Sequence, residues 1–154
     1  ECVETMDKIS LSIEGAINYW KRFNRKEVKH DKDDLESTIA YTTCVTAEHI
    51  EADAIVAYTH KGDSIRKLAG LGAGCPIFAI TDDEKTYYQL GASFNVHPVL
   101  YTEGKTIEDT ISHGIEILKN DGILEKGDTV VLAGGAKILP DDTENKVIGG
   151  FVRL

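Results

Sequence analysis

Residues 54–81 read AIVAYTHKGDSIRKLAGLGAGCPIFAIT, and this stretch decides the fold class. It contains two short, continuous apolar runs, at residues 54–58 and 76–81. Such runs are typical of strands that are buried on both faces of a sheet. Residues 64–69 between them have a helical pattern. The stretch therefore predicts a strand, a helix and a second strand that is parallel to the first.

The same alternation continues towards the C-terminus. Further apolar runs at residues 99–101 and 129–133 predict strands, and residues 83–90 and 106–120 have helical patterns. The tail, residues 146–154, is a candidate fifth strand at the edge of the sheet. We therefore expect an α/β fold, an open sheet with helices on both faces.

Two helices are expected before the first strand. Residues 1–24 carry an apolar stripe at spacings of three and four, formed by Val3, Met6, Ile9, Ile13, Ala16, Ile17 and Trp20. Residues 25–34 are dense in charge and predict an exposed connection. A second helix is expected over residues 37–52, with Asp33 or Asp34 as its N-cap and with Ile39, Ala40, Cys44, Ala47 and Ile50 facing inward. Residues 1–154 suit a single domain.

Composition excludes several classes of function. The chain has 26 acidic and 17 basic residues, a net charge of −9, which argues against nucleic-acid or anionic-membrane partners. No apolar run approaches the roughly 20 residues that span a bilayer. The chain starts with Glu1, and its first residues already have a helical pattern. We therefore expect a piece of a longer cytoplasmic polypeptide.

The residues that could carry catalysis or bind metal form no recognisable constellation. Cys2, Cys44 and Cys75 are odd in number and widely spaced, so we interpret them as reduced thiols that pack in the core. The five histidines show no metal-ligand spacing. We expect neither a metal site nor a catalytic residue on this chain.

The loop after the first strand is the best candidate for a binding site. In an open parallel sheet, ligands bind beyond the carboxyl ends of the strands. Hydroxyls, a glycine and a helix N-terminus in this loop have the chemistry of a phosphate cradle. Its candidate ligands are Thr59, His60, Lys61, Gly62, Asp63 and Ser64. The alternative is an ordinary turn in which Asp63 or Ser64 is only the N-cap of the helix.

The loop after the fourth strand is a second candidate. Residues 134–145 form a long, glycine-led segment that would lie near the first loop if the sheet is doubly wound. Gly135, Ala136 and Lys137 are its candidate ligand-binding residues.

Several segments, in the right order, resemble the C-terminal domain of pyruvate kinase. Residues 1–9 (ECVETMDKI) are similar to the family's EAVxTMxxI, and residues 59–66 (THKGDSIR) to its effector loop TxSGxSxR. Further matches are CPIFAIT at 75–81, FNVHP at 94–98, EKGDTVV at 125–131 and TEN at 143–145. The resemblance covers essentially the whole chain.

The resemblance implies a three-layer α/β/α sandwich with five strands, of which the last is antiparallel. It implies a regulatory and oligomerisation domain that follows a catalytic barrel in the same polypeptide and takes part in a homotetramer. Phosphoryl transfer from phosphoenolpyruvate to ADP, with Mg²⁺ and K⁺, would take place in the barrel. The chain alone would hold no cofactor and would be inactive.

The departures from the family's pattern bear on the effector. Lys61 replaces the usual serine and Asp63 an often basic residue, and Thr110 stands near the position of a second basic residue. A carboxylate beside a phosphate costs about 1 kcal/mol unless a cation offsets it, and we assign that role to Lys61. The chain therefore predicts a sugar monophosphate, a nucleotide or no effector rather than fructose 1,6-bisphosphate. A freestanding phosphometabolite-binding module and a purely structural assembly domain remain the alternatives.

Overall fold

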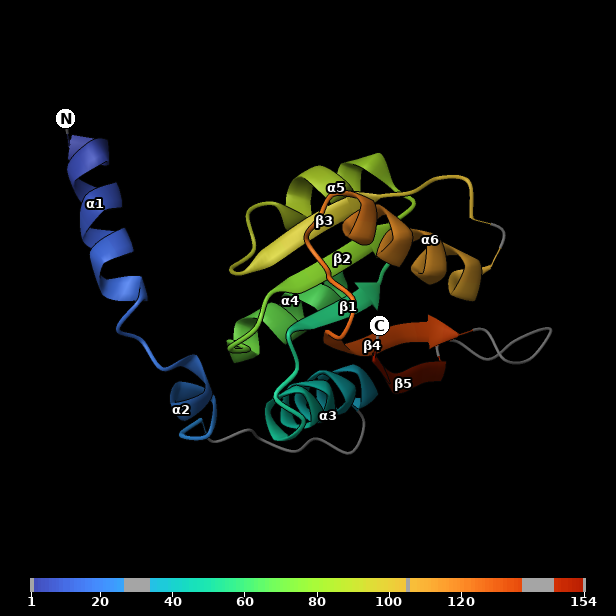
Figure 1. The fold of residues 1–154 in the computed structure, drawn as a ribbon, viewed down its shortest axis with the longest axis horizontal. Coiled ribbons are helices and arrows are strands. Elements are labelled where there is room, and N and C mark those ends of the chain that lie inside the picture. The colour runs from blue at the N-terminus through green and yellow to red at the C-terminus, as the bar shows by residue number, and fades with distance from the viewer. Residues whose placement is uncertain (1, 27–33, 105, 137–145, 154) are drawn as a thin grey trace.

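The structure, a computed structural model, describes residues 2–26, 34–104, 106–136 and 146–153. Within these ranges a twisted sheet is flanked by helices (Figure 1). The helices are α1 (Cys2–Glu14), α2 (Tyr19–Phe23), α3 (Leu35–His49), α4 (Asp63–Leu71), α5 (Glu84–Leu90) and α6 (Ile107–Asn120). The strands are β1 (Ala54–Tyr58), β2 (Ile77–Thr81), β3 (Val96–Leu100), β4 (Thr129–Ala136) and β5 (Lys146–Arg153).

The order of the strands explains where a ligand can bind. It is β3-β2-β1-β4-β5, with parallel pairing among the first four and antiparallel pairing of β5 with β4. From β1 the chain moves outward to β2 and β3, then crosses back to β4 on the other side of β1. The order therefore reverses between β1 and β4, and open α/β sheets bind ligands at such a point. The expected α/β class is confirmed.

Both faces of the sheet are covered, which is why its central strands are continuously apolar. On one face Ile55 and Ala57 of β1 join a cluster with side chains of α3, α4 and α5. On the other face Ala54 and Val56 join a cluster with Leu118 of α6. Successive side chains of a strand point to opposite faces, so a strand between two helical layers has no position for a polar residue.

The edge strand β3 differs from its expected position. Residues 99–101 were expected to form it, but it begins earlier and contains Pro98. The carbonyl of Asn95 accepts from β2, and the N–H of Tyr101 donates to β2. The backbone N–H and C=O groups of successive residues point to opposite sides of a strand. The backbone of Pro98 therefore points away from β2, where its missing N–H removes no hydrogen bond of the sheet. An edge strand tolerates proline for this reason, which the apolar pattern did not reveal.

The expectation of one continuous helix over residues 1–24 is wrong. Helix α1 ends at Glu14, and α2 begins at Tyr19 after a turn around Gly15. Glycine disfavours helix, and the side chain of Asn18 accepts from the N–H of Lys21 at 2.8 Å, which starts a new helix.

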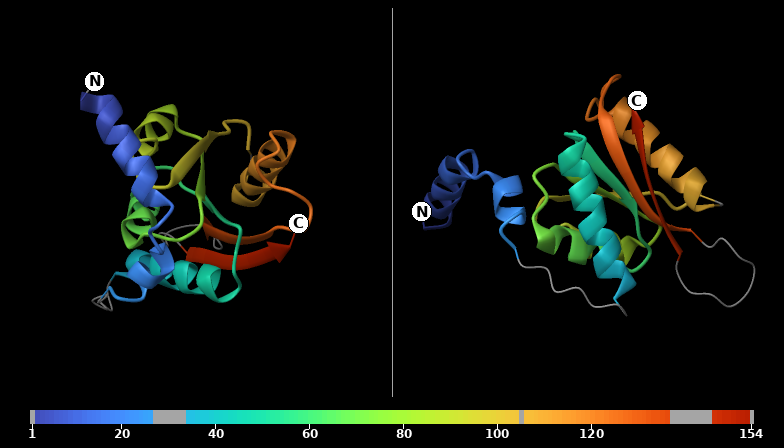
Figure 2. Two further views of the ribbon diagram at one scale, coloured as in Figure 1. Left: turned by 60° about the vertical axis from the view of Figure 1, so that its left-hand side comes forward. Right: turned by 90° about the horizontal axis from the view of Figure 1, so that it is seen from below.

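The apolar stripe of α1 is not part of the core. None of the residues of α1 is buried, and the side chains of Val3, Met6, Ile9 and Ile13 are 78%, 68%, 53% and 51% exposed. Figure 1 and the right panel of Figure 2 show α1 standing away from the sheet. The expectation that Cys2 packs in the core is wrong for the same reason, because it is exposed.

The rest of the N-terminal half agrees better with the sequence. Helix α3 buries Ala40, Cys44 and Ala47 as expected, and the carboxylate of Asp34 is its N-cap. Of the expected connection, residues 27–33 lie outside the described residues. No helix in the described part of the chain is long and apolar enough to cross a membrane.

Candidate functional site

The loop after β1 is built by its own side chains. Thr59 is buried, and its Oγ1 accepts from the N–H of Gly62 at 2.8 Å, which closes the turn. The N–H of Thr59 continues the sheet by donating to the carbonyl of Ile80 at 2.9 Å. Thr59 therefore shapes the loop, and its hydroxyl oxygen already accepts a hydrogen bond within it.

The helix that follows has no side-chain cap. Its N-cap is Gly62, at a left-handed φ of 85°, and neither Asp63 nor Ser64 takes that position. The expectation that Asp63 or Ser64 would be the N-cap in an ordinary turn is therefore wrong. In contrast, side chains cap the four helices α2, α3, α5 and α6, through Asn18, Asp34, Asp83 and Thr106.

The first turn of α4 therefore presents donors to solvent. The first bond of the helix is from the N–H of Arg66 to the carbonyl of Gly62, so the preceding N–H groups have no intrahelical acceptor. The hydroxyl of Ser64 has no hydrogen-bond partner among the described residues. These donors and the positive end of the helix dipole favour an anion.

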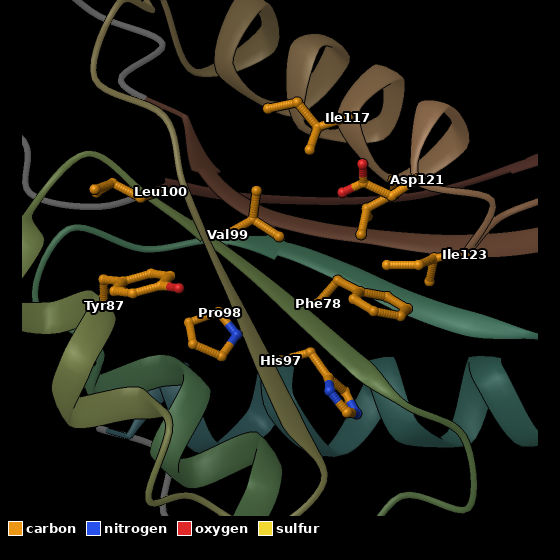
Figure 3. Close-up of a pocket in the computed structure, with 10 residues that line it drawn as sticks. Phe78, Tyr87, His97, Pro98, Val99, Leu100, Ile117, Asp121 and Ile123 are labelled. Carbon is orange, nitrogen blue, oxygen red and sulfur yellow. The ribbon is translucent and has the colours of Figure 1, made fainter.

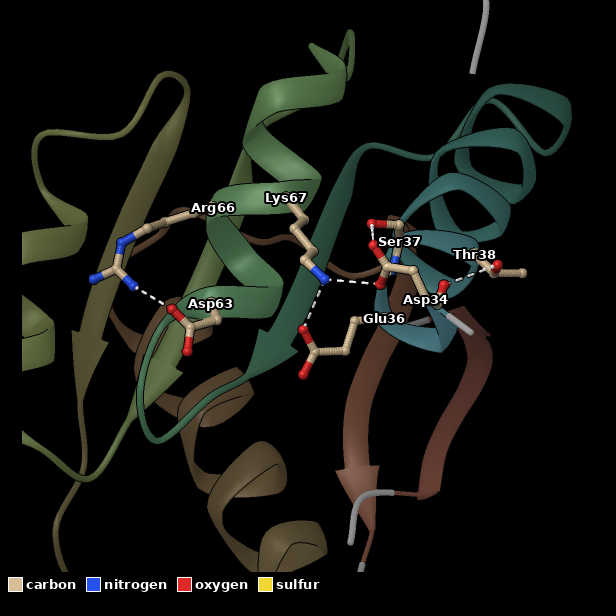
Figure 4. A network of polar contacts seen from close by, with 7 residues as sticks. All are labelled: Asp34, Glu36, Ser37, Thr38, Asp63, Arg66 and Lys67. Atoms are coloured by element: carbon tan, nitrogen blue, oxygen red, sulfur yellow. Dashed lines mark hydrogen bonds and ion pairs between the residues drawn. The ribbon is translucent and has the colours of Figure 1, made fainter. Parts of the chain in front are cut away.

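Arg66 lies over the loop and neutralises Asp63. Its Nη1 donates to Asp63 Oδ1 at 3.0 Å and to the carbonyl of Lys61 at 3.1 Å, and its Nη2 donates to Gln89 Oε1 at 3.0 Å. Figure 4 shows the pair on the first turn of α4. The cation beside Asp63 is thus Arg66, whereas Lys61 was expected. The i,i+3 spacing of Asp63 and Arg66 could have indicated this pair.

A second contact ties the loop to the start of α5. His60 Nδ1 lies 2.6 Å from Asp82 Oδ1, and the carbonyl of His60 accepts from Thr86 Oγ1 at 2.9 Å. Burial, followed by the nearby Asp82 carboxylate, raises the pKa of Tyr58 at the end of β1. His60 is therefore engaged with Asp82, whereas the exposed side chain of Lys61 lies at the surface.

The other side of α4 is fixed to α3. Lys67 Nζ donates to Asp34 Oδ1 at 2.8 Å and lies 3.1 Å from Glu36 Oε2 (Figure 4). The hydrogen bond from Lys67, with those from Ser37, holds the pKa of Asp34 well below its usual value. The same bond to Asp34 raises the pKa of Lys67. The network joins α4 to the start of α3.

The second candidate loop starts later than expected. Gly135 and Ala136 are part of β4, paired with Val147 and Lys146 of β5, so they do not belong to a loop. Small residues continued the strand because β5 supplies a partner at each position. Lys137 and the TEN segment, residues 143–145, lie outside the described residues. β4 pairs directly with β1, so Gly135 and Ala136 belong to the strand next to the one that carries the first loop.

The side chain of Thr110 is not available to bind a second phosphate. It is buried, and its Oγ1 donates to the carbonyl of Thr106 at 2.8 Å within the first turn of α6. No group of three or more His, Cys, Asp or Glu residues in the described ranges could hold a metal ion. The arrangement is suited to binding a single anion at α4.

Comparison with known proteins agrees with this architecture. Residues 37–147 match the family "Pyruvate kinase, alpha/beta domain". The chain is 32% identical over 145 residues to the pyruvate kinase of Clostridium acetobutylicum and 27% identical over 135 residues to that of Thermotoga maritima. These matches cover 94% and 88% of this chain but 30% and 28% of those proteins.

A solved structure has the same fold. It is titled "Cryptosporidium parvum pyruvate kinase in complex with ADP", with a TM-score of 0.74 and 20% identity. The likeness covers 89% of this chain and 27% of that one, so the chain spans between a quarter and a third of each relative. The family match and the shared fold lead to one conclusion: the chain belongs to the α/β-domain family of the pyruvate kinases.

Proposed function

We propose that this chain is the regulatory and assembly domain of a pyruvate kinase, with an effector loop at residues 59–64. One observation carries the regulatory half: among the five helices of the described ranges with an assigned N-cap, only α4 begins without a capping side chain. It follows β1, where the strand order reverses. An anion at this point would satisfy N–H groups that no side chain satisfies.

The proposed effector carries one phosphate that contacts α4. Arg66 offsets Asp63, so the carboxylate adds little repulsion. The direct ligands would be the hydroxyl of Ser64, the N–H groups of the first turn and Lys61. Thr110 is buried and uncharged, which leaves a second phosphate without a partner there. A sugar monophosphate or a nucleotide fits better than a bisphosphate.

The proposed role in assembly rests on the exposed helix α1. A helix with five exposed large apolar side chains (Val3, Met6, Ile9, Leu11 and Ile13) is typical of a surface that packs against another domain or subunit. We propose the catalytic barrel of the same polypeptide and further copies in a homotetramer as its partners. Mg²⁺ and K⁺ would serve that barrel, and the buried free thiols Cys44 and Cys75 suit a cytoplasmic enzyme.

Calorimetry tests the effector loop directly. The chain is titrated with inorganic phosphate, AMP, glucose 6-phosphate, ribose 5-phosphate and fructose 1,6-bisphosphate, and each hit is repeated with Ser64→Ala. Loss of the hydroxyl removes one charge-assisted hydrogen bond, so the affinity should fall about tenfold. Ser12→Ala on α1, an equal change far along the chain, should leave the affinity unchanged.

The outcomes separate the proposal from its alternatives. Tight bisphosphate binding would contradict the single-phosphate argument. No binding at millimolar ligand would favour the purely structural assembly domain. Binding that Ser64→Ala leaves unchanged would place the effector elsewhere.

A further inference from the structure

A second recess lies against the edge strand β3, away from the effector loop. Its volume is about 440 Å³. We call it the β3 groove. The lining residues that give it its character are Phe78, His97, Val99, Ile117, Asp121 and Ile123. Strand β2 separates β3 from β1, so the β3 groove and the effector loop are different sites.

The groove lies between α6 and the edge strand β3. Leu118 of α6 belongs to the cluster that includes Val56 and Val130, and Val99 of β3 packs against that cluster. Ile117 and Asp121 form the wall opposite β3 (Figure 3). A volume of several hundred Å³ is in the range of small-molecule sites.

The floor of the groove is apolar and aromatic. The ring of His97 lies beside that of Phe78, with centroids 5.4 Å apart and planes at 34°. Val99, Ile117 and Ile123 complete the surface, and Ile123 is 49% exposed. Such a floor suits an aromatic or branched aliphatic group.

One carboxylate gives the groove its charge. Asp121 follows α6 as its C-cap, and its side chain makes no hydrogen bond or ion pair with another described residue. The C-terminal end of a helix is itself negative, which adds to the field of the carboxylate. The groove therefore offers an unpaired negative charge beside an apolar floor.

The edge of β3 argues against an extended peptide as the occupant. A peptide that joins a sheet needs outward-facing N–H groups along the edge. Pro98 lies on the outward side in the middle of β3 and has no N–H. A small molecule that fills the groove through its side-chain walls meets no such obstacle.

We propose that the β3 groove binds a small organic cation: a primary ammonium group that pairs with Asp121 and carries an aromatic or branched aliphatic body against Phe78, Val99 and Ile117. The carboxylate of Asp121 requires a positively charged ligand, and the apolar floor requires a ligand with an apolar body.

Three probes of similar shape but different charge test whether the groove prefers a cation. The 154-residue chain is titrated with phenethylammonium, 2-phenylethanol and 3-phenylpropionate, while backbone amide shifts are followed by NMR. We expect shifts at Val99, Asp121 and neighbouring amides, with the ammonium bound about fivefold more tightly than the alcohol. The carboxylate probe should bind more weakly than both.

Variants assign the effect to the groove. Asp121→Asn should abolish the preference for the ammonium and leave binding of the alcohol unchanged. Glu116→Gln removes one charge from the same helix outside the lining and should preserve the preference. Ile117→Trp should fill the groove and weaken all three probes, and Val99→Phe serves the same purpose if that variant does not fold.

Two results would overturn the proposal. One is equal affinity for the three probes. The other is the absence of saturable shifts at the lining amides at millimolar ammonium. Neither result would contradict the proposed effector loop, because phosphate binding at that loop is measured separately.

Discussion

The loops after β1 and β2 follow neighbouring parallel strands at the same edge of the sheet, yet the helices after them begin in different ways. After β2, the carboxylate of Asp83 accepts from the N–H of Thr86 at 2.7 Å and caps α5. After β1, Gly62 begins α4 and supplies no acceptor. The second loop, after β2, is thus closed by its own carboxylate, and the first loop, after β1, has room for an external anion.

The difference also separates stability from binding. A capped N-terminus gains its stability from within the chain. An uncapped one leaves donors unsatisfied until a ligand arrives, so the same groups that cost stability supply affinity. The two loops remain connected, because His60 of the first contacts Asp82 and Thr86 of the second.

The largest expected effect comes from replacing Gly62. An L residue at a φ of 85° is strained, and a Cβ there would lie 3.2 Å from Leu90 Cδ2. Gly62→Ala should lower the free energy of unfolding by about 1–2 kcal/mol and weaken phosphate binding. Urea unfolding measures the first effect and calorimetry the second. Gly91→Ala is the control, since Gly91 has a φ of −59° and a nearest atom 3.5 Å away.

Removing the hydroxyl that closes the first loop should lower the free energy of unfolding somewhat less than Gly62→Ala does. Thr59→Val keeps the shape of the buried side chain but deprives the N–H of Gly62 of its acceptor. We expect a loss of about 1 kcal/mol in the free energy of unfolding. Thr42→Val, on the exposed surface of α3, should be close to neutral. A stable Thr59→Val variant would show that solvent replaces the bond.

The capped loop should show the clearer pH dependence. Hydrogen bonds from Thr86 hold the pKa of Asp83 below its usual 3.8. The stability from this carboxylate is therefore complete above the unfolded pKa and is lost as pH falls through the lower folded pKa. Asp83→Asn, which keeps a capping side chain, should be less stable than the native chain at pH 7. Urea unfolding between pH 7 and pH 2.5 should show this gap closing below about pH 4, and a constant gap would contradict the assignment.

The smallest effect on stability should come from the pair on α4. Asp63 and Arg66 are 66% and 39% exposed, so Arg66→Gln should change the free energy of unfolding by less than about 1 kcal/mol. Its effect on binding should be larger, because Asp63 would then repel the anion. We expect the calorimetric phosphate affinity to fall severalfold, whereas Lys119→Gln on α6 should not change it.

Short-range patterns allowed much of the fold to be predicted. The apolar run at residues 54–58 coincides with β1, and the helical patterns after it identify α4, α5 and α6 to within about two residues. Asp33 or Asp34 was predicted as the cap of α3 from its position before an apolar periodic segment, and Asp34 is the cap. Such signals depend on the backbone period and on local hydrogen bonds, which the sequence carries directly.

The candidate site could be predicted only in part. The sequence identified the loop after β1 but assigned its capping and its compensating cation to the wrong residues, Asp63 or Ser64 and Lys61. Gly62 takes the cap because the turn closes on the buried Thr59. Arg66 pairs with Asp63 three residues away, and Gln89 of α5 holds its other terminal nitrogen. Only the bond to Gln89 joins two elements, whereas the other two contacts are local.

The sequence by itself determined the periodicity of the chain, and with it the α/β class, the parallel central strands and the position of the candidate loop after β1. Tertiary structure alone decided that β1 and β4 are neighbours, that α1 stands away from the core and that a groove lies between α6 and β3. The physical reason is that periodicity reports which faces of an element are apolar. Whether an apolar face is buried depends on which other element reaches it in space.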